Sequence, residues 1–133
     1  MSKTPENFGK GEIQGVIANN SATHVTRVAK TGTGVWELSG ANTYSGNTTL
    51  SAGTLVAGHN SAFGTGTLAL SGVGATLRGD GTARTLANAV SLTQSMVIGG
   101  ASDLTFTGAL THGTGNRTLT VANSGATTFS GPV

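Results

Sequence analysis

The chain has 133 residues and a formal net charge of +2; only 9 % of its residues are charged, while 36 % are hydrophobic. This balance argues against disorder, because disordered segments combine high net charge with low hydrophobicity. The seven Lys and Arg residues are scattered, which excludes the concentrated basic face of a nucleic-acid-binding protein. No apolar run approaches the roughly 20 residues of a membrane span, so no membrane contact is expected within this chain.

The glycine and cysteine content further limits the fold class and the kinds of site that this protein can have. Glycine supplies 22 of the 133 residues, more than twice its usual share of about 7 %. Thr, Ser and Asn fill most polar positions, which suits pleated sheet joined by tight turns. The absence of cysteine excludes disulfides and thiolate metal sites.

The chain divides into a short leading segment and one folded unit. Residues 1–10 are expected to form a flexible N-terminal segment, and residues 11–133 a single domain. The first residues, M-S-K-T-P-E-N-F, lack the apolar core of a signal peptide. If the protein is exported, the signal lies outside this chain.

From residue 13 onward, short alternating runs separated by glycine-containing turns predict strands and no helix. The predicted strands are Ile13–Ile17, Val25–Ala29, Val35–Leu38, Thr48–Ser51, Thr54–Ala57, Thr67–Leu70, Ala75–Arg78, Ala89–Thr93, Met96–Ile98, Leu104–Leu110, Arg117–Val121 and Thr127–Phe129.

Alternation places one side of each strand in a common core. The residues expected to point inward are Trp36, Leu38, Leu50, Leu55, Leu68, Leu70, Leu77, Val90, Leu92, Met96, Ile98, Leu104, Phe106, Leu119, Val121 and Phe129.

Two sequence blocks recur at one offset. Ile13–Ile17 resembles Phe106–Leu110, and Val28–Gly32 resembles Val121–Gly125, each 93 residues further on (13 to 106, 28 to 121). The repetition predicts a longer array of such units.

The predicted unit covers residues 11–102, and a second begins over residues 103–133. Short, evenly spaced strands fit a sandwich, a barrel or a solenoid. A sandwich does not call for repetition, whereas a β-solenoid of roughly six turns, at about 20 residues a turn, accounts for both observations. Its Thr, Ser and Asn residues would form ladders along the outside.

One stretch carries a longer motif, with K-T-G-x-G, then L-S-G-x-N-T-Y-x-G, then G-T-L. It resembles the passenger-associated transport repeat of bacterial autotransporters in order and spacing. The residues that carry the resemblance are Lys30, Thr31, Gly32, Gly34, Leu38, Ser39, Gly40, Asn42, Thr43, Tyr44, Gly46, Gly53, Thr54 and Leu55.

The resemblance implies a right-handed parallel β-helix with open ends, secreted or displayed on the surface of a Gram-negative bacterium. It implies a non-enzymatic structural repeat of a passenger, acting as a rigid surface stalk and aiding translocation and folding. Its partners would be neighbouring β-helix turns of the parent protein, with end-to-end self-association as a further expectation. The alternative is an adhesin or a self-assembling fibre module; an enzyme acting on polysaccharide would need a clustered acidic groove.

Residues with catalytic or metal-binding potential are few. Asp80 and Asp103 lie 23 residues apart, about one turn, and glycosidic cleavage uses two carboxylates; turn residues are the simpler interpretation. His24, His59 and His112 have no other ligand-type residue at metal-binding spacing. No catalytic residue, cofactor or metal site is therefore expected.

Arg78, Gly79 and Asp80 spell a tripeptide that some cell-adhesion receptors recognise, which makes them a candidate adhesion site. The large aromatic residues are expected to lie in the core or stack at its ends rather than to form a carbohydrate platform. These aromatic residues are Trp36, Tyr44, Phe63, Phe106 and Phe129.

Overall fold

The computed structural model describes residues 10–133, and within them every regular element is a β-strand. The predicted flexible segment therefore lies outside the described residues, apart from Lys10, which opens the first strand. The strands are β1 Lys10–Ile13, β2 Val28–Lys30, β3 Val35–Leu38, β4 Thr48–Leu50, β5 Thr54–Ala57, β6 Leu68–Leu70, β7 Thr76–Gly79, β8 Arg84–Leu86, β9 Val90–Leu92, β10 Met96–Gly99, β11 Leu104–Phe106, β12 Leu110–His112, β13 Leu119–Val121 and β14 Thr127–Phe129.

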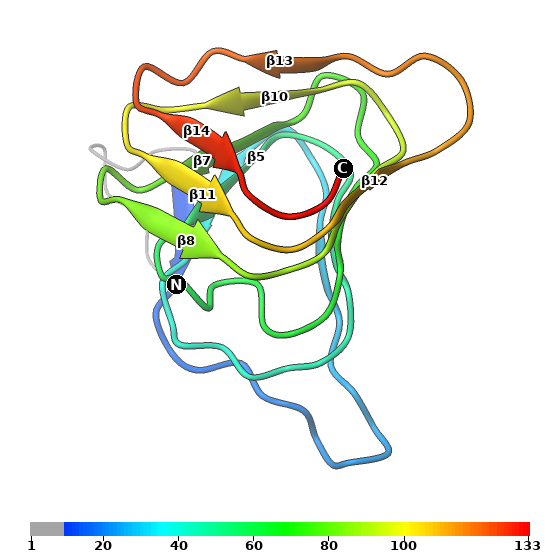
Figure 1. Ribbon diagram of the computed structural model, residues 1–133. Helices are drawn as coiled ribbons and strands as arrows, with labels where there is room; N and C mark the ends of the chain where they lie inside the picture. Colours follow the sequence, from blue (N-terminus) through cyan, green and yellow to red (C-terminus); the bar gives the residue numbers. More distant parts are fainter. Residues whose placement is uncertain (1–9) are drawn as a thin grey trace.

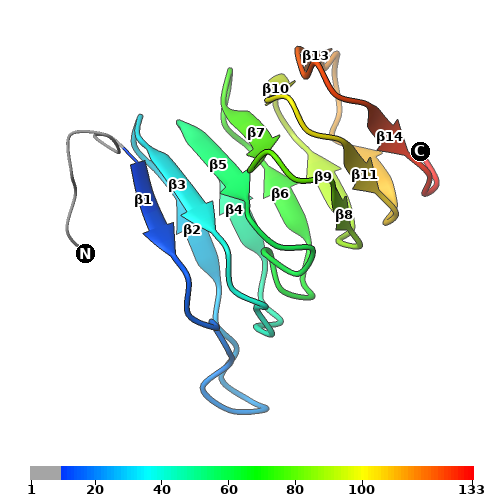
Figure 2. The same ribbon diagram turned by 90° about the vertical axis from the view of Figure 1, so that its left-hand side faces the viewer.

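The strands form three parallel sheets that run along one axis (Figures 1 and 2). The six-stranded sheet has the order β1-β3-β5-β7-β10-β13, the five-stranded sheet β2-β4-β6-β9-β12, and the three-stranded sheet β8-β11-β14. Strands that are neighbours in a sheet belong to successive coils of the chain, so the fold is a β-solenoid of about six turns, as predicted.

The length of a coil can be read from the register of the six-stranded sheet. Ile13 pairs with Leu38, 25 residues later, and Leu38 with Ala57, 19 residues later. Leu77 and Ile98 are 21 residues apart. Coil length therefore varies while strand pairing stays in register, because the turns absorb the difference.

The core fills the space enclosed by the sheets. Leu50, Leu70 and Leu92 stand in register on successive strands of the five-stranded sheet, and all three are buried. The predicted inward residues that are buried are Leu38, Leu50, Leu55, Leu68, Leu70, Leu77, Val90, Leu92, Met96, Ile98, Leu104 and Phe106.

Four predicted core residues are less buried. Leu119 and Phe129 are partly exposed and Val121 is 51 % exposed, because β13 and β14 are edge strands of their sheets. Trp36 is partly exposed and pairs with Gly11 of β1, where its indole fills the space that a side chain would need: a Cβ on Gly11 would lie 2.5 Å from the ring.

Three predicted strands differ from those observed, and one of them, Val25–Ala29, is found as Val28–Lys30. The first strand is Lys10–Ile13 rather than Ile13–Ile17, because the chain leaves the six-stranded sheet after Ile13, as it does after the paired Leu38. The predicted Leu104–Leu110 is two strands, β11 and β12, which lie in different sheets on either side of a corner.

Strand β8 was not predicted, and Leu86 is its only apolar residue. It is held in place by its pairing with β11.

The 93-residue offset is not the period of the fold. Ile13 lies in the six-stranded sheet, whereas Phe106 lies in the three-stranded one. Val28 and Val121 also lie in different sheets. The structural repeat is a single coil, so similar short motifs occupy different sides of the solenoid.

Candidate functional site

The repeat-like motif extends from β2 to β5 and so occupies parts of two neighbouring coils. Its apolar members Leu38 and Leu55 belong to the core, where they are 2 % and 1 % exposed. Its exposed members Thr31, Gly34 and Thr43 lie in turns, and Thr54 begins β5. The remaining members bind one coil to another, and they define the candidate functional site.

Lys30 occupies a core position of the five-stranded sheet, since it pairs with the buried Leu50. Its side chain is almost completely covered, and burial lowers the pKa of its amine. The Nζ atom donates to the carbonyl oxygens of Thr31 at 2.7 Å, Gly32 at 2.9 Å and Ala52 at 3.3 Å. Lys30 therefore links its own turn to the equivalent turn of the next coil.

Gly53 lies directly against that turn. Its φ is +69°, and a Cβ atom there would lie 2.5 Å from both the Gly32 and the Gly34 carbonyl oxygens. The left-handed backbone and the lack of space together require glycine. The first glycine of the G-T-L part of the motif thus allows two turns to stack in contact.

Asn42 is 2 % exposed and forms bonds in both directions along the axis. Its Oδ1 accepts from the Ile17 amide at 2.8 Å, in the coil before, and its Nδ2 donates to the Ala62 carbonyl at 2.7 Å, in the coil after. Asn was predicted on the outside of the solenoid, which is wrong for this residue. A side-chain amide can lie inside because it satisfies a buried N–H and a buried C=O at once.

Tyr44 is also completely buried. Its hydroxyl and the Thr48 hydroxyl are 2.5 Å apart, and Thr48 in turn donates to the Phe63 carbonyl at 3.3 Å. Burial raises the pKa of Tyr44, although the hydrogen bond to Thr48 opposes this. The Tyr44 ring is core, as predicted, and its hydroxyl group connects it to the following coil.

Three motif residues fix the spacing between the first two coils. The Ser39 amide donates to the Ile13 carbonyl at 3.0 Å, and the Gly46 amide to the Thr26 carbonyl at 3.1 Å. A Cβ on Gly40 would lie 2.4 Å from the Gly15 carbonyl oxygen. Small residues are therefore needed where the backbones of the coils approach each other.

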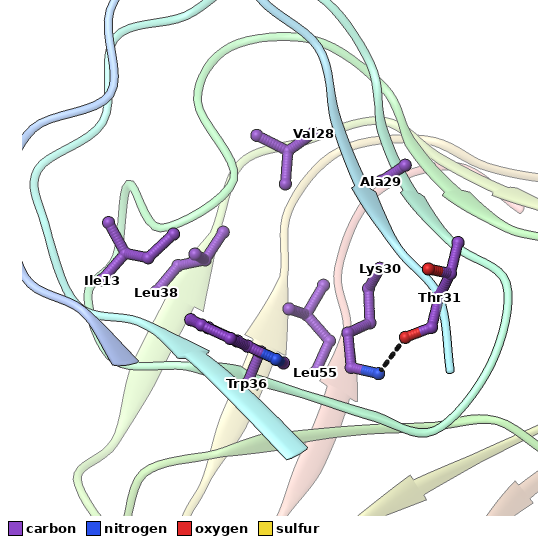
Figure 3. A pocket seen from close by; sticks show the side chains of 8 residues that line it. All are labelled: Ile13, Val28, Ala29, Lys30, Thr31, Trp36, Leu38 and Leu55. Atoms are coloured by element: carbon purple, nitrogen blue, oxygen red, sulfur yellow. Dashed lines mark hydrogen bonds between the residues drawn. The ribbon is translucent and has the colours of Figure 1, made fainter. Parts of the chain in front are cut away.

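An apolar cavity of about 270 Å³ lies where β1 and β2 end the solenoid. In Figure 3 the Lys30 amine points to the Thr31 carbonyl, beside Trp36 and Leu55. The amine already donates to three carbonyl groups, so it has no N–H left to offer a ligand. The residues that line the cavity are Ile13, Val28, Ala29, Lys30, Thr31, Trp36, Leu38 and Leu55.

The candidate adhesion tripeptide lies at the end of β7. Arg78 is partly buried and Gly79 is buried. The Asp80 carboxylate accepts from Arg84 Nε at 3.0 Å and Nη2 at 2.6 Å. This pairing lowers the pKa of Asp80, chiefly through its hydrogen bonds with Arg84. The tripeptide's carboxylate is thus engaged within the protein.

Of the other candidate residues, His24 and His59 lie in bends, His112 ends β12, and Asp103 precedes β11. Asp103 accepts from the Ala126 amide at 2.8 Å, a structural contact between coils. No group of three His, Asp or Glu residues suited to a metal ion occurs within residues 10–133. Tyr44, Phe63 and Phe106 are buried, while Phe129 stacks on Phe106 with ring centres 4.8 Å apart.

Asn88 is the main structural residue that the sequence did not reveal. It is 4 % exposed, and its Nδ2 donates to the carbonyls of Phe63, Gly64 and Gly66 at 2.8–3.2 Å. One signal was available: Ala-Asn occurs at residues 18–19, 41–42, 87–88 and 122–123. All four Asn side chains bond to the backbone of another coil.

Parallel coils joined by buried side-chain bonds define the protein as a β-solenoid repeat module. Residues 28–57, from the start of β2 to the end of β5, match the family model of the passenger-associated transport repeat. This match confirms the resemblance of this segment to the transport repeat of autotransporter passengers. No curated protein and no solved structure gives a match to the chain. The described residues also contain no helix long and apolar enough to cross a membrane.

Proposed function

We propose that this chain is a non-enzymatic structural repeat that extends an autotransporter passenger as a rigid stalk and helps it to fold during export. The observation that carries the proposal is that residues 28–57 bond to the coils on both sides. Lys30 and Asn42 reach the following coil, and Asn42 also reaches the preceding one. A folded repeat of this kind offers a template for its neighbours.

A physical argument connects the template to export. Each coil that joins the solenoid removes apolar side chains from water, worth about 25 cal/mol per Å², so folding outside the cell opposes backward movement of the chain. The sequence has no cysteine and few charges, which leaves the unfolded chain easy to thread through a pore. The stalk would lengthen by about 4.8 Å for each coil, the spacing of paired strands.

The surface of a Gram-negative bacterium, or the medium around it, is the location that this function requires. In the same proposal residues 11–133 act as one unit, with residues 11–102 as the longer sequence repeat and residues 103–133 as the start of the next. Its partners are the adjoining coils of the passenger.

An export assay with a matched pair of variants tests the proposal. Leu77 is buried and its neighbour Thr76 is partly exposed on the same strand. In a passenger fused to an autotransporter's outer-membrane pore, Leu77→Asp should reduce surface display strongly, whereas Thr76→Asp should leave it near the parent level. Antibody labelling of intact cells measures both. Equal display of the two variants would contradict folding-assisted export.

The alternative, an adhesin that uses Arg78, Gly79 and Asp80, has its own test. Asp80→Glu should abolish cell attachment if the tripeptide is recognised, and Arg84→Gln should increase it, because that change releases the Asp80 carboxylate without altering the tripeptide. Unchanged attachment with both variants would exclude adhesion through this site. Sedimentation velocity over a range of concentrations tests the fibre alternative, which requires assembly as concentration rises.

A further inference from the structure

One side of the solenoid changes its construction along the axis. The three-stranded sheet begins with β8, and its edge faces the loop of residues 58–67 that joins β5 to β6. A further strand beside β8 would continue the hydrogen-bond ladder of this sheet with its backbone N–H and C=O groups. The loop of residues 58–67 contains no strand, so it cannot do this. Buried groups of this kind must find other partners.

Asparagine side chains supply those partners from three positions. Asn42 approaches the loop from the preceding coil and donates to the Ala62 carbonyl at 2.7 Å. Asn88 approaches it from the following coil and donates to the Phe63, Gly64 and Gly66 carbonyls.

The third position lies within the loop itself. Asn60 accepts from the Thr85 amide of β8 at 3.0 Å, at the position where a neighbouring strand would have accepted. Asn42, Asn60 and Asn88 together are called the asparagine clasp below. Its bonds run from the coil before the loop, through the loop, to the first strand of the third sheet.

We infer that the asparagine clasp is the folding device that converts the two-sheet coils of the transport repeat into the three-sheet coils that follow it. The clasp holds the loop of residues 58–67 in one conformation, and that loop then positions β8. Strand β8 pairs in register with β11, and β11 with β14, so the position of β8 is continued by both. The sign of the device in the sequence is an Ala-Asn dipeptide whose asparagine is buried, at residues 41–42 within the transport repeat and at 87–88 beyond it.

If the clasp acts as inferred, removing one of its asparagines should loosen the loop and β8 in particular. A general loss of stability would instead affect the whole fold. Asn42→Ala removes the acceptor of the Ile17 amide and the donor to the loop. Asn88→Ala removes the donor to three loop carbonyls. The control is Asn47→Ala, which removes a single exposed bond to the Thr67 amide at 3.3 Å.

Amide hydrogen exchange of the whole 133-residue chain, followed by NMR, measures the outcome. With Asn88→Ala, exchange should accelerate roughly tenfold or more at the loop amide Gly64, bonded to Ser61, and at the β8 amide Thr85. The Ser71 amide, between β4 and β6, should keep its parent rate. Asn47→Ala should change none of these three.

Equal acceleration at all amides, or none at Gly64 and Thr85, would overturn the inference. If the buried variants do not fold, Asn60→Ala decides, because Asn60 is exposed: faster exchange at Thr85 and Arg84 supports the clasp, and an unchanged rate at both overturns it. The importance of the clasp for export rests on the proposed function. The experiments can contradict the structural role of the clasp and the export proposal independently. Lost protection with normal surface display would remove the export proposal and leave the clasp.

Discussion

Gly53 and Gly74 have nearly the same backbone conformation, but only Gly53 lies against a neighbouring turn. Comparing alanine at the two positions therefore isolates the effect of that contact on stability. The φ of Gly53 is +69° and that of Gly74 is +71°. A Cβ on Gly53 would lie 2.5 Å from two carbonyl oxygens and 2.7 Å from Lys30 Nζ, whereas a Cβ on Gly74 would have nothing within 4 Å. Alanine at either site meets the same conformational penalty, but only one site is crowded.

The expected free-energy changes follow from that difference. A non-glycine residue in the left-handed region costs about 1 kcal/mol, which is the whole effect expected for Gly74→Ala. Insertion of a methyl group into a filled site costs typically about 1–3 kcal/mol more. Gly53→Ala should therefore destabilise the fold by about 2–4 kcal/mol. The Gly53 backbone and the Gly32–Gly34 turn would have to move apart to accept it.

Urea unfolding followed by fluorescence suits this comparison, because Trp36 is the single tryptophan of the chain. With a slope of about 2 kcal/mol per molar urea, the two variants should differ in midpoint by roughly 1 M. Gly15→Ala is the control: Gly15 has neither a positive φ nor a contact within 4 Å, so its midpoint should hardly move. Equal midpoints for Gly53→Ala and Gly74→Ala would refute contact between the turns as the reason for glycine at position 53.

Four further substitutions test the ion pair, the buried amine and the core. Pairing with Arg84 lowers the pKa of Asp80, so the pair stabilises the fold above the usual aspartate range, near about pH 4, and this contribution is lost as the pH falls through the lowered pKa. Urea midpoints across pH should therefore show Asp80→Asn less stable than the parent by up to about 1 kcal/mol at neutral pH and no different in acid. Lys30→Met leaves three carbonyls without their donor and should cost about 1–3 kcal/mol in the same assay. Phe106→Ala should cost about 3–5 kcal/mol, and Phe129→Ala clearly less, because Phe129 is only partly buried; thermal unfolding with equal shifts would contradict this order.

Much of the fold can be predicted because parallel coils impose a simple pattern. Leu55, Leu77 and Ile98 alternate with outward residues on their strands and stand in register in the six-stranded sheet. A period of two places them inside without further information. The motif from Lys30 to Leu55 has fixed spacing, because Gly40, Gly46 and Gly53 each meet the backbone of a neighbouring coil at a set position.

The sequence did not reveal which polar residues lie inside. Asn42 and Asn88 were expected on the outer surface with the other Thr, Ser and Asn residues. Thr85, Thr105 and Thr128 do form such an outer ladder. The two groups differ in their hydrogen-bond partners. An outward hydroxyl group can bond to water, whereas each buried Asn donates to carbonyl groups 20–25 residues away in the sequence.

The sequence by itself determined that this chain is all-β, that it winds in short coils of parallel strands, and that residues 28–57 resemble a transport repeat. These follow from local properties: alternation, glycine at turns and a motif of fixed order. The tertiary structure decided which side each short motif occupies, and so separated Ile13 from Phe106 despite their similar surroundings in sequence. It also decided where the third sheet begins, because Asn42 and Asn88 acquire their roles only when coils distant in sequence are stacked and leave carbonyl groups with no other donor.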